Sequence, residues 1–89
     1  VNRTTLAFFM QTEEIYATLG EVFRDVFGPD APDPVPEMTA DDVDGWDSLN
    51  HVRLIIAVER AFSIRFSTRE ISGLKNVGDL TAVVAKKKS

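Results

Sequence analysis

The sequence contains no cysteine and one histidine, His51, in 89 residues. Without cysteine the chain cannot form a disulfide, a thiolate nucleophile or a cysteine-ligated zinc site, and a single histidine excludes a site built on several histidines. The longest apolar run, 6–10, is far shorter than the roughly 20 residues of a membrane-spanning helix, so no membrane span is predicted. The run is also too short for a signal peptide, and no small-residue cleavage site follows it. We therefore expect a cytoplasmic protein.

The composition is that of a globular protein, with 44% hydrophobic and 27% charged residues. The length allows one domain with one small core. Residues 1–47 contain eleven acidic and two basic residues, and residues 48–89 contain three acidic and eight basic residues, so the two halves carry net charges of −9 and +5. The acidic half would repel phosphates, so no nucleic-acid partner is predicted. A basic partner near residues 30–47 is expected instead.

Helical periodicity predicts three main helices and one short helix, and no segment alternates as a strand would. The first helix is predicted to start at Thr12, a capping residue followed by Glu13 and Glu14, and to stop before Gly28 and Pro29. Its apolar stripe consists of Ile15, Leu19, Val22, Phe23, Val26 and Phe27. Residues 1–11 are then an N-terminal extension that we expect to be flexible.

A long loop over residues 28–46 holds all four prolines, with a short helical turn near 41–43. The next helix is predicted to open at Asp47 or Ser48 and to run to Phe62. The capping-box sequence 67–70 predicts a short helix that ends near Gly73. The last helix is predicted to follow its cap, Asn76, with Asp79 in the first turn and Val77, Leu80, Val83 and Val84 on its buried side. Lys86, Lys87 and Lys88 suit the negative end of this helix, and we expect residues 86–89 to form a basic, solvated tail. The predicted fold class is all-α, a four-helix bundle.

The helix over 48–62 has apolar residues on two sides. At about 100° per residue, one side carries the residues that we assign to the core, Leu54, Ile55, Val58 and Phe62. The other side carries Leu49, Val52 and Ile56, with Arg53 and Arg60 beside them. So small a bundle cannot bury both sides, and an exposed apolar strip rimmed by charge is typical of a docking surface. The alternative is that the helix at 68–73 or the aromatic residues Phe8 and Phe9 cover this strip.

The stretch 45–49, Gly-Trp-Asp-Ser-Leu, joins the acidic loop to this helix. Ser48 would lie in the first turn with an exposed hydroxyl, where backbone N–H groups favour an attached phosphate diester. Asp47 would cap the helix and supply an oxygen to Mg²⁺ during phosphate transfer, and no resident metal site is predicted. Residues of this kind at a helix start usually only cap it, a contribution of about 1 kcal/mol, so the pair taken alone favours a cap, and its position at the junction of the acidic loop and the helix is what favours the chemical role.

The triplet Asp47-Ser48-Leu49 and the residues after it resemble the signature of the acyl carrier protein family. The matching positions downstream are Val52, Leu54, Ile55, Val58, Glu59, Phe62, Ile64, Phe66, Glu70, Ile71 and residues 77–80. The resemblance covers roughly residues 12–85, nearly the whole predicted domain. The triplet is similar to those of fatty acid and polyketide carriers, whereas peptidyl carriers usually place glycines immediately before the serine motif.

The resemblance implies that a phosphopantetheinyl transferase attaches 4′-phosphopantetheine from coenzyme A to Ser48. The thiol of this group would hold acyl intermediates as thioesters, which is consistent with a chain that encodes no cysteine. The protein would be a monomeric, non-catalytic carrier for acyltransferases, ketosynthases and other acyl-processing enzymes. Leu49 and Ile56 match family positions that contact such partners, and we predict docking by Leu49, Val52, Arg53, Ile56 and Arg60.

The sequence departs from the family on the second long helix. Carriers of primary fatty acid synthesis usually have acidic residues there, whereas this chain has Asn50, Arg53, Arg60 and Ala61 and keeps Glu59. An enzyme whose basic surface fits an acidic helix should dock poorly on these arginines. We therefore favour polyketide or other specialised acyl biosynthesis over primary fatty acid synthesis, and a D-alanyl-type carrier remains an alternative.

Three other functions compete with the carrier. A calcium loop around Gly45 fails, because it would place Ala40 and His51 at positions that need oxygen ligands. An enzyme is not favoured, because no nucleophile–base pair or phosphate-binding loop is evident. We assign His51 no catalytic role and Trp46 the role of a loop anchor. A helical adaptor without a prosthetic group explains the bundle and the exposed strip equally well, and stays the main alternative.

Overall fold

The computed structural model describes the backbone of residues 3–88 and the side chains of residues 12–88. It contains the helices α1 (Arg3–Phe27), α2 (Ser48–Phe62), α3 (Thr68–Ser72) and α4 (Val77–Lys88), and the 3₁₀ turn η1 (Ala40–Asp42). No strand occurs among residues 3–88, so the all-α prediction is confirmed. None of these helices is long and apolar enough to cross a membrane.

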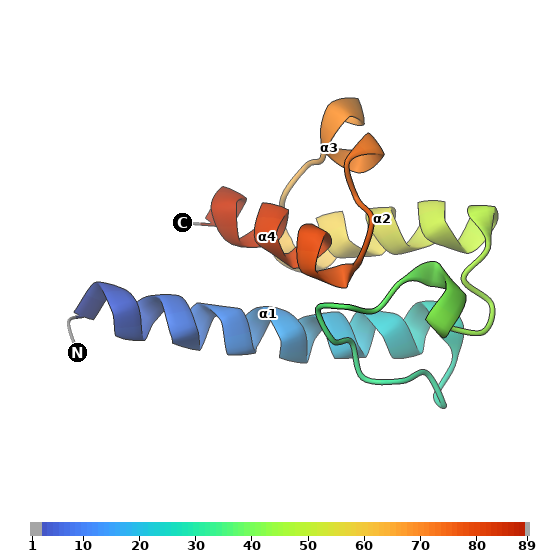
Figure 1. The fold of residues 1–89 in the computed structure, drawn as a ribbon, viewed down its shortest axis with the longest axis horizontal. Coiled ribbons are helices and arrows are strands. Elements are labelled where there is room, and N and C mark those ends of the chain that lie inside the picture. Colours follow the sequence, from blue (N-terminus) through green and yellow to red (C-terminus); the bar gives the residue numbers. More distant parts are fainter. Residues whose placement is uncertain (1–2, 89) are drawn as a thin grey trace.

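Helix α1 runs the length of the molecule, and α2 and α4 pack on the same side of it (Figure 1). The long loop after α1 folds back over the end of that helix before it enters α2, and the short α3 stands above α2 and α4 (Figure 1). The core lies between α1, α2 and α4. It consists of Ile15, Leu19, Val22 and Phe23 from α1, Leu54, Ile55 and Val58 from α2, Val77, Leu80 and Val84 from α4, and Met38 and Val43 from the loop.

One predicted helix boundary is wrong. Helix α1 begins at Arg3 rather than at Thr12, because the residues before Thr12 include strong helix formers that continue the helix. The separation of residues 1–11 as a flexible extension stays a prediction, and the side chains of Phe8 and Phe9 lie outside the described residues. Lys86–Lys88 form the last turn of α4 and are exposed, so they stand at the negative end of the helix as the sequence predicts, and their separation as a tail stays a prediction.

The remaining boundaries agree with the capping signals in the sequence. Asp47 is the N-cap of α2, and α1 ends at Phe27, immediately before Gly28. At α3 the Ser67 N–H donates to Glu70 Oε1 at 2.8 Å and the Glu70 N–H donates to Ser67 Oγ at 3.1 Å, which completes the predicted capping box. Asn76 Oδ1 accepts from the Asp79 N–H at 2.8 Å at the start of α4.

The long loop is fixed to the start of α4 by backbone hydrogen bonds. The Val77 N–H donates to the Met38 carbonyl at 2.9 Å, and the Gly78 N–H donates to the Pro36 carbonyl at 2.8 Å. A Cβ atom at Gly78 would stand 3.1 Å from the Pro36 oxygen, so a glycine is what permits this close approach. The loop is therefore part of the packed structure, and it holds the entrance to α2 in place.

Candidate functional site

The chain enters α2 through a tight turn at Gly45. Gly45 has a φ of +85°, in the left-handed region that favours glycine. The Trp46 N–H donates to the Val43 carbonyl at 3.2 Å, and the Asn50 side-chain amide donates to the Gly45 carbonyl at 2.7 Å. The first bond lies within the loop, and the second joins the loop to the first turn of α2. Residues 46–48 are therefore held in position from the loop and from the helix.

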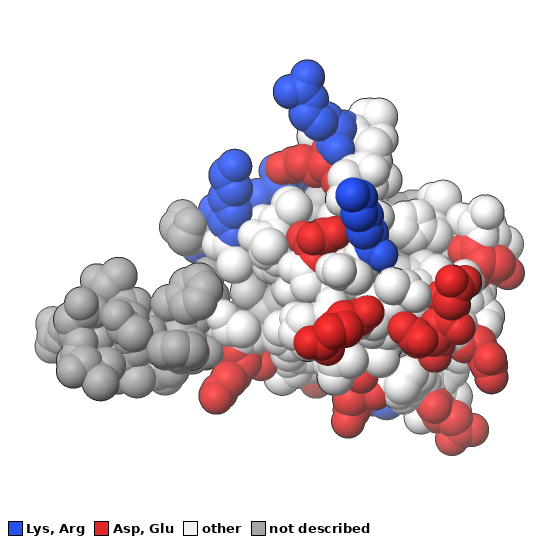
Figure 2. Space-filling view, in the orientation of Figure 1, with Lys and Arg blue, Asp and Glu red and all other residues white. Residues whose placement is uncertain are grey.

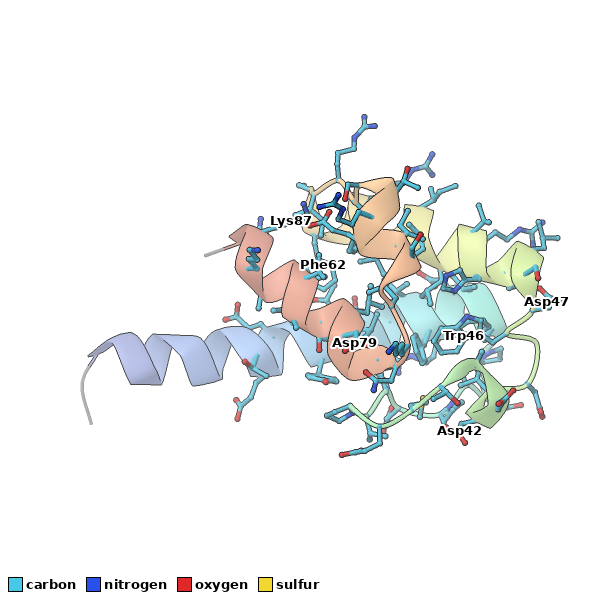
Figure 3. The ribbon with its side chains drawn as sticks, turned by 45° about the horizontal axis from the view of Figure 1, so that its top comes forward. Asp42, Trp46, Asp47, Phe62, Asp79 and Lys87 are labelled. Carbon is cyan, nitrogen blue, oxygen red and sulfur yellow. The ribbon has the colours of Figure 1, made fainter. Side chains whose placement is uncertain are left out.

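Asp47 caps α2 as the sequence predicts. Its backbone is extended, with φ −97° and ψ −174°, and its Oδ1 accepts from the Asn50 N–H at 2.8 Å. Its carbonyl accepts from the His51 N–H, also at 2.8 Å. The carboxylate thus satisfies one of the free donors of the helix start. Figure 3 shows Asp47 at the outer end of α2, away from the core.

Ser48 is the first residue of α2, and its side chain is exposed. Within residues 12–88, no hydrogen bond engages its hydroxyl or the amides of Ser48 and Leu49. Beside it lies an open hollow of about 400 Å³, lined by Ala40, Trp46, Asp47, Ser48 and His51. The site therefore offers an accessible hydroxyl next to free helix N–H donors, in a hollow with room for a substituent. Among the described side chains, no group of three His, Asp or Glu residues is placed to hold a metal.

Trp46 lies inward of Asp47 (Figure 3) and anchors the loop. Its ring lies edge-on to Phe23, with centroids 5.7 Å apart, and is tilted against Phe27 at 5.4 Å. Its Nε1–H donates to Nδ1 of His51 at 3.1 Å, and the two rings are nearly parallel. The predicted role of Trp46 as an anchor is confirmed, and the role of His51 is to accept this bond. Aromatic packing of this kind holds the loop against α1.

A small cavity, partly open to solvent, lies behind this pair and reaches the core. It has a volume of about 80 Å³ and is lined by Ala40, Trp46, His51, Leu54, Ile55, Leu74, Lys75, Asn76 and Leu80. Ala40, Trp46 and His51 line both this cavity and the hollow at Ser48. The Trp46–His51 pair therefore stands between the exposed hydroxyl and the interior. Sequence reasoning missed the cavity, because its lining comes from the loop, α2 and residues 74–80 together.

The predicted apolar strip on α2 is exposed. Leu49, Val52 and Ile56 are 60%, 55% and 43% exposed, while Leu54 and Val58 on the opposite side are fully buried. Arg53 and Arg60 are exposed as well. Helix α3 does not cover the strip, so that alternative is wrong, while the alternative cover by Phe8 and Phe9 falls on side chains outside the described residues.

Charge is distributed unevenly over the molecule. In Figure 2 the acidic side chains gather over the part where α1 and the long loop lie, and the basic side chains lie over α3 and the end of α4. Asp41, Asp42 and Asp44 are exposed in the loop that leads to Ser48. Ser48 thus lies at the border between an acidic loop and a helix whose exposed side carries arginines.

A groove that the sequence analysis did not identify lies at the C-terminal end of α2. It has a volume of about 560 Å³ and is lined by Ile56, Glu59, Arg60, Ser63, Ile64 and Arg65. Helix α2 ends at Ser63 in the left-handed conformation, with φ 56° and ψ 47°, which turns the chain back along the helix. The sequence holds a partial signal for this groove in the arginines at 60 and 65, but not the turn that brings them together.

Comparison with known proteins shows similarity to carriers. No protein-family model matches the chain. It is 33% identical over 75 residues to the meromycolate extension acyl carrier protein of Mycolicibacterium smegmatis. This match covers 83% of this chain and 75% of that protein. It is 32% identical over 75 residues to an acyl carrier protein of Rhodococcus erythropolis, with 83% and 81% covered. The solution structure of a holo acyl carrier protein from Geobacter metallireducens matches with a TM-score of 0.75 and 43% identity, over 81% of this chain and 83% of that one.

Proposed function

Because the chain belongs to the acyl carrier protein family, we propose that it carries acyl groups on a 4′-phosphopantetheine group esterified to Ser48. When attached, this group supplies a terminal thiol that holds the acyl group as a thioester. The chain itself supplies the attachment point, the surface that partner enzymes contact and the loop that fixes both. The single observation that carries the proposal is the exposed Ser48 hydroxyl at the start of α2.

The surroundings of Ser48 fit a phosphodiester. The amides of Ser48 and Leu49 are donors without a partner among the described residues, and the positive end of the helix dipole favours an anion there. The carboxylate of Asp47 is held in its cap by the Asn50 N–H, which fixes its direction. The adjoining hollow leaves room for the first atoms of the substituent.

The modification is a group transfer from coenzyme A. The Ser48 Oγ loses its proton and forms a new P–O bond, while the phosphoanhydride bond of coenzyme A breaks and adenosine 3′,5′-bisphosphate leaves. The reaction needs a phosphopantetheinyl transferase, and the exposed carboxylates of Asp41, Asp42 and Asp44 favour a basic surface on that enzyme. In this reaction Asp47 would supply one oxygen to Mg²⁺, and the other ligands would come from coenzyme A, the transferase and water.

Acyltransferases, ketosynthases and other acyl-processing enzymes dock on the exposed side of α2 in this proposal. Leu49, Val52 and Ile56 form the apolar centre, and Arg53 and Arg60 form the charged rim. Apolar centres with polar rims are the usual anatomy of protein interfaces. Because Leu49 follows Ser48 directly, an enzyme seated on this strip has the acyl group within its reach.

The small cavity gives the cargo a place to shelter. It is lined mainly by apolar side chains of α2 and residues 74–80 and is separated from Ser48 by the Trp46–His51 pair. At about 80 Å³ it admits only a short apolar segment. Sheltering of cargo would therefore require movement of Trp46 and His51, and a longer chain would require the helices to separate.

Specialised acyl biosynthesis is the pathway class that we favour. Several relatives are named for meromycolate extension, while another is named only as an acyl carrier protein. The arginines on α2 also favour a specialised pathway, because they would repel an enzyme whose basic surface fits an acidic helix. A carrier of primary fatty acid synthesis and a D-alanyl-type carrier are the weaker alternatives.

Intact-mass spectrometry tests the proposal. The protein is incubated with coenzyme A, Mg²⁺ and a broad-specificity phosphopantetheinyl transferase. The wild type should gain the mass of one phosphopantetheine group, and Ser48→Ala should gain none. Ser72→Ala, which removes another exposed serine hydroxyl from a helix, is the matched control and should be modified like the wild type. An unchanged wild-type mass with several transferases would favour the adaptor without a prosthetic group.

A further inference from the structure

The groove at the C-terminal end of α2 combines apolar walls with unpaired arginines. Ile56 is 43% exposed and Ile64 is half-buried, so both present apolar surface to it. Arg60 and Arg65 also line the groove, and both are exposed. Within the described side chains no carboxylate forms a salt bridge with either arginine. Two guanidinium groups are therefore available to an outside ligand.

Glu59, the one acidic residue that lines the groove, forms no salt bridge with Arg60 or Arg65. Glu59 is half-buried, and its Oε2 accepts a hydrogen bond from the Phe66 N–H at 2.9 Å. Its carboxylate thus holds the segment after α2 in place. Glu59 is also the only acidic residue within α2, so the exposed side of this helix keeps a positive rim.

We propose that this groove receives an acidic surface of a partner protein, with an apolar side chain on Ile56 and Ile64 and carboxylates on Arg60 and Arg65. The inference rests on the proposed function, because the partner is an acyl-processing enzyme that serves the carrier. Arginine suits this role, since its planar group binds a carboxylate through two parallel hydrogen bonds. The partner's surface is thus acidic where it meets α2. Its charge is opposite to that of an enzyme whose basic surface fits an acidic helix.

The charge of the rest of the molecule favours a protein over a polyanion. Residues 1–47 carry a net charge of −9, and the exposed acids at 41, 42 and 44 lie in the loop at the other end of α2. A nucleic acid or an extended anionic lipid surface would meet this acidic region as well as the groove. A protein surface can place its acidic groups at the groove alone.

The position of the groove leaves Ser48 free. Arg60 lies twelve positions after Ser48, which at 1.5 Å per residue is about 18 Å along the helix. A partner seated in the groove therefore does not cover the hydroxyl. The acidic loop beyond Ser48 repels the partner's acidic groups, so docking is favoured in one direction along α2.

Two synthetic peptides test the charge preference. Both form an amphipathic helix with the same leucine stripe, and the flanking positions are all glutamate in one and all lysine in the other. Each is titrated into the full-length, ¹⁵N-labelled protein, and amide resonances are followed. The glutamate peptide should shift Ile56, Ser63, Ile64 and Arg65, and the lysine peptide should bind this groove at least about tenfold more weakly.

Charge-reversed variants locate the effect. Arg60→Glu with Arg65→Glu should weaken binding of the glutamate peptide by about tenfold, and added salt should then no longer weaken the binding that remains. The control is Arg69→Glu with Lys88→Glu, which makes the same change in net charge at exposed positions outside the groove. This control should bind the glutamate peptide as the wild type does.

Three results would overturn the inference. They are equal or tighter binding of the lysine peptide at the groove, an equal loss in the control variant, and binding to phosphatidylglycerol vesicles that Arg60→Glu with Arg65→Glu abolishes. The variant should keep the urea unfolding midpoint of the wild type, so that a loss of peptide binding is not a loss of fold. If the wild type gains phosphopantetheine but its groove does not prefer the glutamate peptide, this inference alone is contradicted. If the wild type gains no phosphopantetheine, the proposed function is contradicted.

Discussion

The two sides of helix α2 are built from similar residues and differ in what they do. Leu54 and Val58 are fully buried, whereas Leu49 and Val52 are 60% and 55% exposed. Each side thus offers a leucine and a valine, so the difference lies in position and not in chemistry. Burial makes one side a source of stability, and exposure leaves the other side free for recognition. One helix can therefore hold the bundle together and still leave an apolar surface exposed.

The largest expected effect comes from truncating the matched leucines. Leu54→Ala should lower the free energy of unfolding by about 3 kcal/mol, because it removes buried methyl groups and leaves a cavity. Leu49→Ala should change it by less than about 0.5 kcal/mol, because its side chain already faces water. Urea unfolding followed by the fluorescence of Trp46, the only tryptophan, measures both. Similar losses in the two variants would show that the strip is packed rather than exposed.

A smaller effect is expected at the start of α2. Asp47→Ala removes the cap on the Asn50 N–H and should cost about 1 kcal/mol of unfolding free energy. Asp44→Ala also removes an exposed carboxylate from this loop, but that carboxylate caps no helix. This variant should leave the free energy of unfolding nearly unchanged. Thermal unfolding by circular dichroism compares the two. If Asp44→Ala proves as costly as Asp47→Ala, the loss reflects loop charge and not the cap.

Reversing charge on the exposed side should change recognition and not stability. Arg53→Glu with Arg60→Glu should raise exchange with primary fatty acid synthesis enzymes several-fold, because it removes repulsion from their basic surfaces. The measurement is kcat/KM of a fatty acid ketosynthase toward the acylated variant, with urea unfolding as the control. Unchanged kcat/KM values would contradict the docking argument, and a large loss of stability would show that these arginines support the fold.

The smallest effect concerns a contact away from both sides of α2. The Ser67 N–H bond, followed by the hydrogen bond with Lys87, lowers the pKa of Glu70 below its usual value. A carboxyl whose pKa is lower in the folded state contributes stability above the pKa of the unfolded chain, and this contribution is lost as pH falls through the folded pKa. Glu70→Gln should therefore flatten the acid side of the stability curve. Urea midpoints from neutral to acid pH check this, and an equally steep decline in both proteins would contradict it.

Local rules predicted the parts of the site that depend on neighbours in the sequence. Asp47 and Ser67 were predicted as caps, because capping involves residues only a few positions apart. The exposure of the Leu49 strip followed from helical periodicity and the small size of the bundle. The start of α1 was mispredicted, because Thr12 with two following glutamates has the same pattern on the surface of a helix as at its beginning.

Tertiary contacts explain what sequence reasoning missed. Met38 and Val43 belong to the core although they lie in the loop. Backbone hydrogen bonds hold Pro36 and Met38 against α4, whereas Val43 bonds within the loop, to Ala40 and Trp46. The bond between Trp46 and His51 depends on the left-handed turn at Gly45. Such contacts join segments that no local pattern connects, so the cavity behind this pair and the groove at Arg60 became visible only in the fold.

The protein isolated from its native host offers the most direct measurement. Its intact mass is recorded before and after treatment with hydroxylamine, which cleaves thioesters, and the modified residue is located by peptide mapping. We expect Ser48 to carry phosphopantetheine with an acyl group, and hydroxylamine to remove the acyl group and leave the phosphopantetheine in place. Native protein with an unmodified Ser48, or with a modification on another residue, would contradict the assignment of this chain as a carrier that acts through Ser48.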